Sequence, residues 1–405
     1  MDVNSDILCQ ICSYLPTYDI LSFSLISYYY YKNILNNIQI MKTHTFTIKK
    51  YFKNLKFLNN LSYKIYNINL NENQHITDQD FSYLKDIYSL KIAGSNQITI
   101  TDKAFEHLKG IYSLDMSYCN QNTITDKAFE HLKGIHSLNI SRCNQNTITD
   151  QAFEHLKGIH SLNISYCNQN TITDQAFEHL KGIHSLNISY CSQKTITDQA
   201  FKYLKGIHTL IMEYCNQNTI TDKAFKYLQN INILCIRSCR QNTITDKAFK
   251  YLKNVHTLDM SRCNQETITN KAFENLQNIN TLNISICKQK TITDEAFKNL
   301  KNISKLKMSF CNQNTVTAKA LLNLFNIQYL DITYCNQIYL TDNTFTNLKS
   351  INKLKISYCV HNSLTHKAFE NMKNINYIDI SGLDHTTLGL ENLNIEKIIT
   401  DRQMY

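Results

Sequence analysis

Residues 161–184, with the sequence SLNISYCNQNTITDQAFEHLKGIH, decide the fold, because most of the chain beyond residue 76 repeats this stretch with small changes. Its Ile-Thr-Asp signature begins at Ile76 and returns every 24 residues without insertion or deletion. The threonines of this signature and its variants are Thr77, Thr101, Thr125, Thr149, Thr173, Thr197, Thr221, Thr245, Thr269, Thr293, Thr317, Thr341 and Thr365. A fixed period of this length is typical of stacked supersecondary units. The sequence therefore predicts a repeat array.

Each repeat, called a coil below, begins with a short strand. In residues 161–165, Leu162 and Ile164 alternate with serine and asparagine. Alternation with a period of two predicts a half-buried strand, with the apolar side chains inward and the polar ones outward. A polar turn, residues 168–171, is expected to follow.

The second half of each coil predicts a helix. Asp174 is placed to act as its N-cap, and Ala176, Phe177 and Leu180 are expected to be buried, with Gly182 ending the helix. Two coils lack this aspartate, because Ala318 and His366 replace it, whereas Asn270 is expected to cap in its place.

The apolar positions Ile159, Leu162, Ile164 and Cys167 spell a pattern that resembles the leucine-rich repeat, specifically its cysteine-containing type. The resemblance implies an α/β solenoid of 24-residue repeats, with parallel strands on the concave face and helices on the convex face. Roughly fourteen strands are expected to stack into one continuous core.

The first 40 residues lie outside the repeat and predict three short helices. Their pattern resembles the F-box, although Val3-Asn4 and Tyr28 depart from it. The matching residues are Asp6-Ile7-Leu8, Ile11, Tyr14-Leu15-Pro16, Asp19-Ile20-Leu21, Ile26-Ser27 and Tyr30-Tyr31. The alternative is a helical cap that closes the first coil, because solenoids need capped ends.

An F-box followed by leucine-rich repeats resembles a substrate-receptor subunit of a cullin-RING ubiquitin ligase. The resemblance implies docking on a Skp-type adaptor, and through it on a cullin, while the repeats hold a protein target. Helix-in-groove burial would use apolar anchors. The candidates are Ile7, Leu8, Leu15, Pro16, Ile20, Leu21, Leu25 and Tyr30. The alternatives are a protein-binding scaffold with no ligase link, and a nucleic-acid-binding solenoid.

These patterns divide the chain into four segments. They are an F-box-like segment at 1–40, a linker or N-terminal cap at 41–65, a solenoid at 66–382 and a C-terminal cap at 383–405. The linker is expected to contain one helix. The first strand is centred either on Tyr66 and Ile68 or on Ile68 and Leu70.

Composition limits the kinds of partner. The chain has 405 residues, 42 Lys and Arg, 33 Asp and Glu, and a formal net charge of +9. The lysines fall largely on predicted helices and are mixed with glutamate, so a solvated helical face is expected and nucleic-acid binding is not. No apolar run has the length of a membrane span, and membrane association is not expected.

Cysteines form the most regular column of the sequence. Of the fourteen, eleven recur at one position of the coil: Cys119, Cys143, Cys167, Cys191, Cys215, Cys239, Cys263, Cys287, Cys311, Cys335 and Cys359. We expect buried, reduced thiols and no metal or disulfide. A chain without a secretory signal and with reduced thiols is expected in the cytoplasm, or also in the nucleus, and not to be secreted.

Two smaller features suggest metal chemistry only at first sight. Cys9 and Cys12 form a C-x-x-C inside the first predicted helix, without a second pair, and are expected to be structural thiols. Histidines also form columns, at His136, His160, His184, His208 and His256 and at His107, His131, His155 and His179. We expect them to be exposed repeat positions, because no carboxylate or thiol joins them at ligand spacing.

Recognition is expected where the coils diverge. The coils from 102 to 198 are nearly identical, whereas the outward strand positions vary from Thr209 onward. The candidate substrate-binding residues are Ile211, Glu213, Tyr214, Arg237, Asp259, Arg262, Lys305 and Lys307. A column that includes Tyr166, Tyr214 and Arg262 either supplies binding hot spots or only covers the corner of each coil.

No catalytic constellation is present in the sequence. It contains no phosphate-binding loop, nucleophile elbow, His-Glu metal motif or pair of carboxylates outside the repeat. We therefore expect a binding protein without a cofactor, monomeric by itself, and no enzyme.

Overall fold

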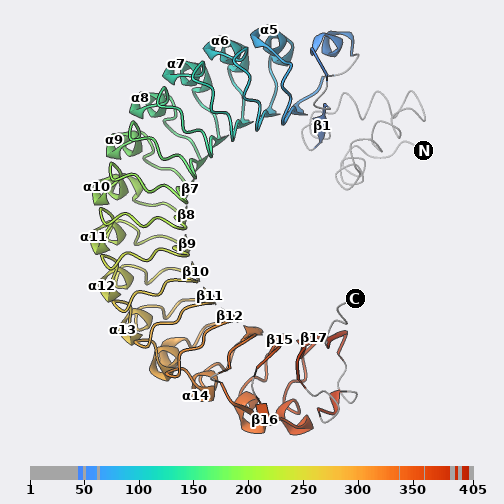
Figure 1. Ribbon diagram of the computed structural model, residues 1–405, viewed down its shortest axis with the longest axis vertical. Coiled ribbons are helices and arrows are strands. Elements are labelled where there is room, and N and C mark those ends of the chain that lie inside the picture. The colour runs from blue at the N-terminus through green and yellow to red at the C-terminus, as the bar shows by residue number, and fades with distance from the viewer. Residues whose placement is uncertain are drawn as a thin grey trace, which may run out of the picture. The chain divides into compact units, whose positions relative to one another are not determined.

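The structure is a computed structural model (Figure 1). It describes residues 44–48, 52–61, 64–336, 338–359, 361–383, 388–390 and 395–400. The predicted F-box-like segment and all its candidate anchors lie outside the described residues. The chain divides into two compact units, Met1–Leu186 and Asn187–Tyr405, called the first and the second unit.

In the first unit each coil contributes a three-residue strand and a short helix. The strands are β1 (Thr45–Thr47), β2 (Asn67–Asn69), β3 (Ser89–Lys91), β4 (Ser113–Asp115), β5 (Ser137–Asn139) and β6 (Ser161–Asn163). The α-helices and 3-10 helices (η) are η1 (Lys56–Asn60), α5 (Asp78–Phe81), η2 (Ser82–Leu84), α6 (Asp102–Phe105), η3 (Glu106–Leu108), α7 (Asp126–Phe129), η4 (Glu130–Leu132), α8 (Asp150–Glu154) and α9 (Asp174–Glu178). Each strand pairs in parallel with the next one along the chain.

The second unit continues the same pattern beyond β7 (Ser185–Asn187), which spans the boundary between the units. Its strands are β8 (Thr209–Ile211), β9 (Ile233–Cys235), β10 (Thr257–Asp259), β11 (Thr281–Asn283), β12 (Lys305–Lys307), β13 (Tyr329–Asp331), β15 (Lys353–Lys355), β17 (Tyr377–Asp379) and β18 (Lys397–Ile399). Its helices are α10 (Asp198–Phe201), η5 (Lys202–Leu204), α11 (Asp222–Phe225), α12 (Asp246–Phe249), α13 (Asn270–Phe273), η6 (Asp294–Asn299), α14 (Ala318–Leu321), η7 (Asp342–Phe345) and η8 (His366–Ala368). β14 (Leu340–Thr341) and β16 (His361–Ser363) form a separate two-stranded sheet.

Within each unit, neighbouring coils lie closer together on the strand side than on the helix side. Next to the strands of the first unit, the ring centroids of Tyr88 and Tyr112 are 4.5 Å apart, whereas under the helices those of Phe81 and Phe105 are 6.5 Å apart. In the second unit the ring centroids of Tyr190 and Tyr214, beside the ends of the strands, are 4.4 Å apart, and those of Phe273 and Phe297 under the helices are 6.5 Å apart. The strand side of each unit is therefore its concave side, with the helices opposite (Figure 1). This arrangement confirms the predicted leucine-rich-repeat fold.

The core is built from the same inward positions in every coil. Leu162 and Ile164 of the strand and Phe177 of the helix are at most 1% exposed. The cysteine column is buried as predicted, and each thiol for which a hydrogen bond is resolved donates to a carbonyl of the preceding coil, as Cys167 does to Ile140 over 3.1 Å. Each coil therefore completes the core of its neighbour, which explains why the period has no insertions.

The predicted helix cap is wrong by one residue. Thr173, not Asp174, is the N-cap of α9, and its hydroxyl accepts a hydrogen bond from the Gln175 N–H over 3.1 Å. The aspartate of each coil instead reaches the next coil. Asp150 accepts from the Thr173 N–H over 2.7 Å and from the Thr173 hydroxyl over 2.6 Å. We call this contact the aspartate–threonine pair.

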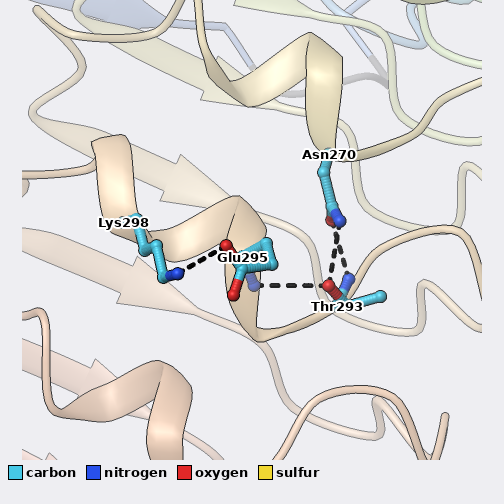
Figure 2. Close-up of polar contacts among 4 residues, drawn as sticks. All are labelled: Asn270, Thr293, Glu295 and Lys298. Atoms are coloured by element: carbon cyan, nitrogen blue, oxygen red, sulfur yellow. Dashed lines mark hydrogen bonds and ion pairs between the residues drawn. The ribbon is translucent and has the colours of Figure 1, made fainter.

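The coils that lack this aspartate show that capping of the helix and the contact with the next coil depend on different residues. Asn270 keeps the pair, because its Oδ1 accepts from the Thr293 N–H and its Nδ2 donates to the Thr293 hydroxyl, both over 2.9 Å (Figure 2). Ala318 cannot do either, yet Thr317 still caps α14 over 3.2 Å. The aspartate therefore joins coils, and the threonine starts the helix.

The ends of the array extend further than the sequence predicted. β1 lies inside the segment expected to be a linker, and the expected helix of that segment is the 3-10 helix η1. Ile68 of β2 pairs with Leu90 of β3. Of the two predicted registers, the structure therefore has the one with Ile68 and Leu70 as the inward residues. At the other end, Leu390 is buried as expected for a cap, but Ile398 is 41% exposed and belongs to the additional strand β18.

The turn after each cysteine, which was predicted to be polar, contains a buried glutamine. Gln169, in the turn predicted to be polar, is 5% exposed, and its Nε2 donates to the Cys143 carbonyl over 3.1 Å. Every coil from residue 121 to residue 313 buries its glutamine, and Gln121 makes the equivalent hydrogen bond to the Ser95 carbonyl over 3.0 Å. The asparagine before it is exposed and varies, as in Arg240 and Lys288. The glutamine stays the same from coil to coil while the residue before it changes, and this difference in the sequence indicates that the glutamine is buried.

Candidate partner-binding surface

The strand face of the first unit is uniform at β5 and β6. β5 and β6 both read Ser-Leu-Asn, with the serine and asparagine half-buried and pointing outward. The asparagines bind within their own coil, since the Asn139 side chain accepts from the Ser141 N–H and the Asn163 side chain from the Ser165 N–H, both over 3.0 Å. This surface offers a partner few distinctive groups.

The strand face of the second unit begins with an apolar and acidic region. Ile233 is 36% exposed. The half-buried Cys235 thiol donates to a carboxylate oxygen of Glu213 over 3.3 Å. Burial raises the pKa of Cys235, and the charges of Asp259 and Glu213 raise it further. This thiol is therefore a neutral hydrogen-bond donor at neutral pH.

From β12 onward, two rows of alternating residues run across the strands. The first, called the lysine–tyrosine row, consists of paired positions in successive strands: Lys305, Tyr329, Lys353, Tyr377 and Lys397. The second, called the lysine–aspartate row, consists of Lys307, Asp331, Lys355 and Asp379. Parallel pairing without a register shift places each lysine directly beside a tyrosine or an aspartate of the next strand.

The lysine–tyrosine row is held together by cation–π contacts. The Lys305 amine lies 5.0 Å and the Lys353 amine 5.8 Å from the centroid of the Tyr329 ring. The Lys353 amine is also 3.9 Å from the centroid of the Tyr377 ring. Burial raises the pKa of Tyr329 to about 12, and the charge of Asp331 adds to the shift. The phenol is therefore protonated at physiological pH and can donate to Asp331.

The aspartates of the second row are occupied by hydrogen bonds from their own and adjacent coils. Asp331 accepts from the Thr333 N–H over 3.2 Å and from the Tyr329 hydroxyl over 3.5 Å. Asp379 accepts from the hydroxyls of Ser357 and Ser381. The carboxylates are thereby fixed in position.

A third feature, called the corner column, follows each strand. Its non-glycine members adopt a left-handed backbone conformation with φ between 54° and 62°. They are Tyr118, Arg142, Tyr166, Tyr190, Tyr214, Ser238, Arg262, Ile286, Phe310, Tyr334 and Tyr358. Such φ values are costly for residues with a side chain, so neighbouring coils must hold them in place.

Stacking accounts for part of this stabilisation. The Arg142 guanidinium lies 3.9 Å from the Tyr166 ring centroid, and Tyr190 and Tyr214 stack at 4.4 Å. The nearby Ser238 hydroxyl and the charge of Arg262 lower the pKa of Tyr214. Several of these rings remain exposed, for example 49% of Tyr118. The column therefore covers the coil corners and also presents aromatic surface, so the geometry is compatible with both interpretations made from the sequence.

The structure sorts the eight predicted substrate-binding residues into these features. Ile211, Asp259, Lys305 and Lys307 lie on strands, Glu213 and Arg237 just after strands, and Tyr214 and Arg262 on the corner column. Their role in binding stays a prediction. Tyr377 and Lys397 of the lysine–tyrosine row and Asp379 of the lysine–aspartate row were not predicted from the sequence, although the alternation of Lys-Leu-Lys with Tyr-Leu-Asp was a signal for both rows.

Of the remaining candidate sites, the Cys9 and Cys12 pair lies outside the described residues. Across the described residues, no group of three or more His, Cys, Asp or Glu side chains is arranged to hold a metal ion. His136 and His160 stack face to face, with ring centroids 4.4 Å apart. In the first histidine column His160, His184 and His256 are exposed as expected, whereas the histidines of the second column are half-buried. None of the helices in the described part of the chain combines the length and the apolar content needed to cross a membrane.

Comparison with known proteins gives a family and a fold. The sequence matches the family described as BspA type leucine-rich repeat region (6 copies) over residues 74–208, 170–304 and 266–393. This match supports the predicted leucine-rich repeat, and the cysteine-containing type stays a prediction. No F-box family matches, and no curated protein sequence matches the chain.

Solved structures support the fold. A leucine-rich-repeat protein of Leptospira interrogans is 19% identical, with 87% of this chain and 88% of that chain covered and a TM-score of 0.70. TLR13, solved with the RNA ssRNA13, is 18% identical, with 88% and 55% covered and a TM-score of 0.62. Toll of Drosophila, solved with Spatzle, is 13% identical, with 78% and 50% covered and a TM-score of 0.57. This chain therefore spans about half the length of the Toll and TLR13 chains.

Proposed function

This chain belongs to the family of BspA-type leucine-rich-repeat proteins, and we propose that it is a non-enzymatic scaffold that binds a protein partner on the strand face of its second unit. One observation carries the proposal. The inward positions of the coils keep the same kind of buried apolar residue in both units, whereas the outward strand positions, which are Ser with Asn or Asp in β4 to β6, vary from coil to coil from β8 onward.

A difference confined to the outward positions argues for recognition. Substitutions that touch neither the core nor the aspartate–threonine pairs contribute little to stability. The surface they create combines exposed Ile233, the half-buried Arg237 and the acidic Asp259 within neighbouring coils. Apolar, cationic and anionic groups in one patch suit a folded protein surface better than a continuous polyphosphate.

The structural relatives are consistent with a concave binding surface. Repeat solenoids use their extended concave faces for binding. The solved Toll structure is a complex with Spatzle, and that of TLR13 is a complex with an RNA. Similarity of fold does not choose between these ligand classes, so we base the choice on the surface of this chain.

Position-specific crosslinking tests the proposal. A photo-crosslinking amino acid would be placed at Ile233 on the second-unit strand face, at Asn163 on the uniform strand face, and at exposed Lys250 on the helix side. We expect discrete protein adducts from position 233, identified by mass spectrometry, and none from the other two positions. Equal adducts at all three positions, or none at 233, would contradict a partner on this face.

A second candidate function is that of a substrate receptor in a ubiquitin ligase. It is supported by the spacing of Leu8, Leu15-Pro16, Ile20-Leu21 and Tyr30 in the first 40 residues, which resembles an F-box. In this case the partner on the strand face would be a ubiquitination target, and the protein would act in the cytoplasm or nucleus.

Capture of a Skp-type adaptor separates the ligase receptor from a plain scaffold. The full-length chain is compared with a chain lacking residues 1–40 and with a Leu15→Ala, Pro16→Ala variant. The ligase role requires capture by the full chain alone. If the adaptor is absent from every sample, or is retained after deletion, the ligase role is excluded while the scaffold function stands.

A further inference from the structure

We propose that the lysine–tyrosine and lysine–aspartate rows bind an extended acidic protein segment whose carboxylates are spaced three residues apart. The inference rests on the proposed scaffold function, because it names the partner chemistry for one part of the same face. Three arguments support it: the unneutralised charge of the lysines, the distance between them, and the covered faces of the tyrosines.

The two rows carry more positive than negative charge. Lys305, Lys307, Lys353, Lys355 and Lys397 face only Asp331 and Asp379. Both aspartates already accept hydrogen bonds from hydroxyl or backbone donors. The ion pairs found among the described residues include none of these lysines. The surface is therefore complementary to an anionic partner.

The lysines occur on alternate strands. Neighbouring strands lie about 4.7–4.9 Å apart, so the lysine pairs of β12 and β15 are separated by about 9–10 Å, as is Lys397 of β18 from the pair in β15. A peptide in the extended polyproline II conformation rises about 3.1 Å per residue with three residues per turn, so every third side chain lies on the same face and about 9 Å further along. A segment that crosses the strands with an acidic residue at every third position would reach all three cationic strands.

The tyrosines of the row are poorly suited to nucleic acid. Single-stranded nucleic acid is bound by stacking its bases on open aromatic faces along a positive groove. Here the amines of Lys305 and Lys353 lie near the Tyr329 ring, and Lys353 lies 3.9 Å from the Tyr377 ring centroid. Asp331 and Asp379 also interrupt the positive charge on every second strand, which would repel a continuous chain of phosphates.

Two peptides of identical composition test this geometry. One places glutamate at every third position among alanine and serine, and the other clusters the same glutamates together. Binding of each labelled peptide to the full chain is measured by fluorescence anisotropy at several salt concentrations. We expect the spaced peptide to bind about tenfold more tightly than the clustered one. The reason is that it can make two more exposed contacts between a carboxylate and a lysine.

The chain itself supplies a variant that keeps the frame. Lys305→Thr with Lys307→Asn converts β12 to the Thr-Leu-Asn sequence of β11, which the same frame already accommodates. The control, Lys301→Thr with Lys319→Asn, removes two exposed lysines at other positions of the same coils. We expect the β12 variant to weaken binding of the spaced peptide about tenfold and the control to leave it within about twofold.

Each other outcome overturns the inference. Equal binding of both peptides, or equal losses in both variants, would show a nonspecific charge effect. A uridine oligonucleotide that binds more tightly than the spaced peptide and is lost in the β12 variant would assign the rows to nucleic acid. If no peptide binds while adducts still form at position 233, the acidic-segment inference fails and the scaffold function stands. If no adducts form there, the scaffold function itself fails.

Discussion

The coils of β4 to β6 and the coils of β8 to β18 have the same kind of interior but different strand faces. In both regions, as far as the coil of β11, a buried leucine, cysteine, glutamine and phenylalanine recur at the same positions. The outward strand residues are Ser, Asn and Asp in the first region, whereas in the second they include Ile, Lys and Tyr. The difference shows that stability and recognition occupy separate positions of one repeat.

The largest expected effect is the slow reaction of the buried cysteine thiols compared with the same thiols in the unfolded chain. This protection should be equal in both regions. Burial raises the pKa of Cys167 in the first unit and of Cys287 in the second to about 12, against an ordinary value of 9.0. Only the thiolate reacts with iodoacetamide, so folded thiols should react slower than unfolded ones by on the order of a thousandfold below pH 9. Mass spectrometry of each cysteine after timed alkylation, with a urea-unfolded control, measures this. Faster labelling of Cys287 than of Cys167 would mean that the second interior is looser.

The same shift gives a pH dependence of stability. Above pH 9 the thiols of the unfolded chain lose their protons while the folded thiols keep theirs, so the unfolded state is favoured as the pH rises toward 12. The urea midpoint should therefore fall between pH 8 and pH 10.5, and substitution of Cys167 and Cys287 by alanine should reduce this fall.

Truncation of one buried and one exposed residue tests directly whether stability depends on the inward positions and not on the outward ones. Phe249 in α12 is fully buried and Ile233 in β9 is 36% exposed. Phe249→Ala should cost about 3–5 kcal/mol because it leaves a cavity. Ile233→Ser, which restores the residue found in the uniform coils, should change stability by less than about 0.5 kcal/mol. Denaturant unfolding measures both, and a large loss from Ile233→Ser would mean that the varied face also stabilises the array.

The aspartate–threonine pair should matter less than the core and more than the surface. The carboxylate of Asp222 accepts from the Thr245 N–H and hydroxyl, each over 2.7 Å. Asp222→Ala leaves the partly buried donors unpaired and should cost about 2 kcal/mol. Asp222→Asn is the matched control, because Asn270 already makes the same two contacts with Thr293, and it should cost less than about 1 kcal/mol. Equal losses would show that charge, and not geometry, holds the coils together.

The sequence predicted the interior well because the interior is periodic. The positions of Leu162, Ile164 and Phe177 follow from apolar spacing alone, and the structure buries all three. The cap was misplaced because both Thr173 and Asp174 are good caps, and one coil in isolation does not show that the aspartate reaches the next coil. The contacts of the rows were missed for the same reason. Lys353 and Tyr377 lie in different coils, and parallel pairing brings them together.

Ala318→Asp is the smallest and most informative change, because it adds a missing pair to the varied region. Thr341 of the next coil is not free at present: its N–H donates to the Thr344 hydroxyl over 2.9 Å, and the two hydroxyls lie 3.3 Å apart. An aspartate at 318 would replace these neutral contacts by two bonds to a carboxylate, which are stronger by about 1 kcal/mol in total.

We therefore expect the urea midpoint of Ala318→Asp to rise by an amount equivalent to about 1 kcal/mol. Ala318→Asn should give a smaller rise, and Ala318→Glu none, because its longer side chain would not reproduce the aspartate geometry. Thr317 caps α14 without help from residue 318, so a gain cannot be attributed to capping. An unchanged midpoint would mean that Thr344 already satisfies Thr341 as well as a carboxylate does, and that this coil has a local substitute for the contact between coils.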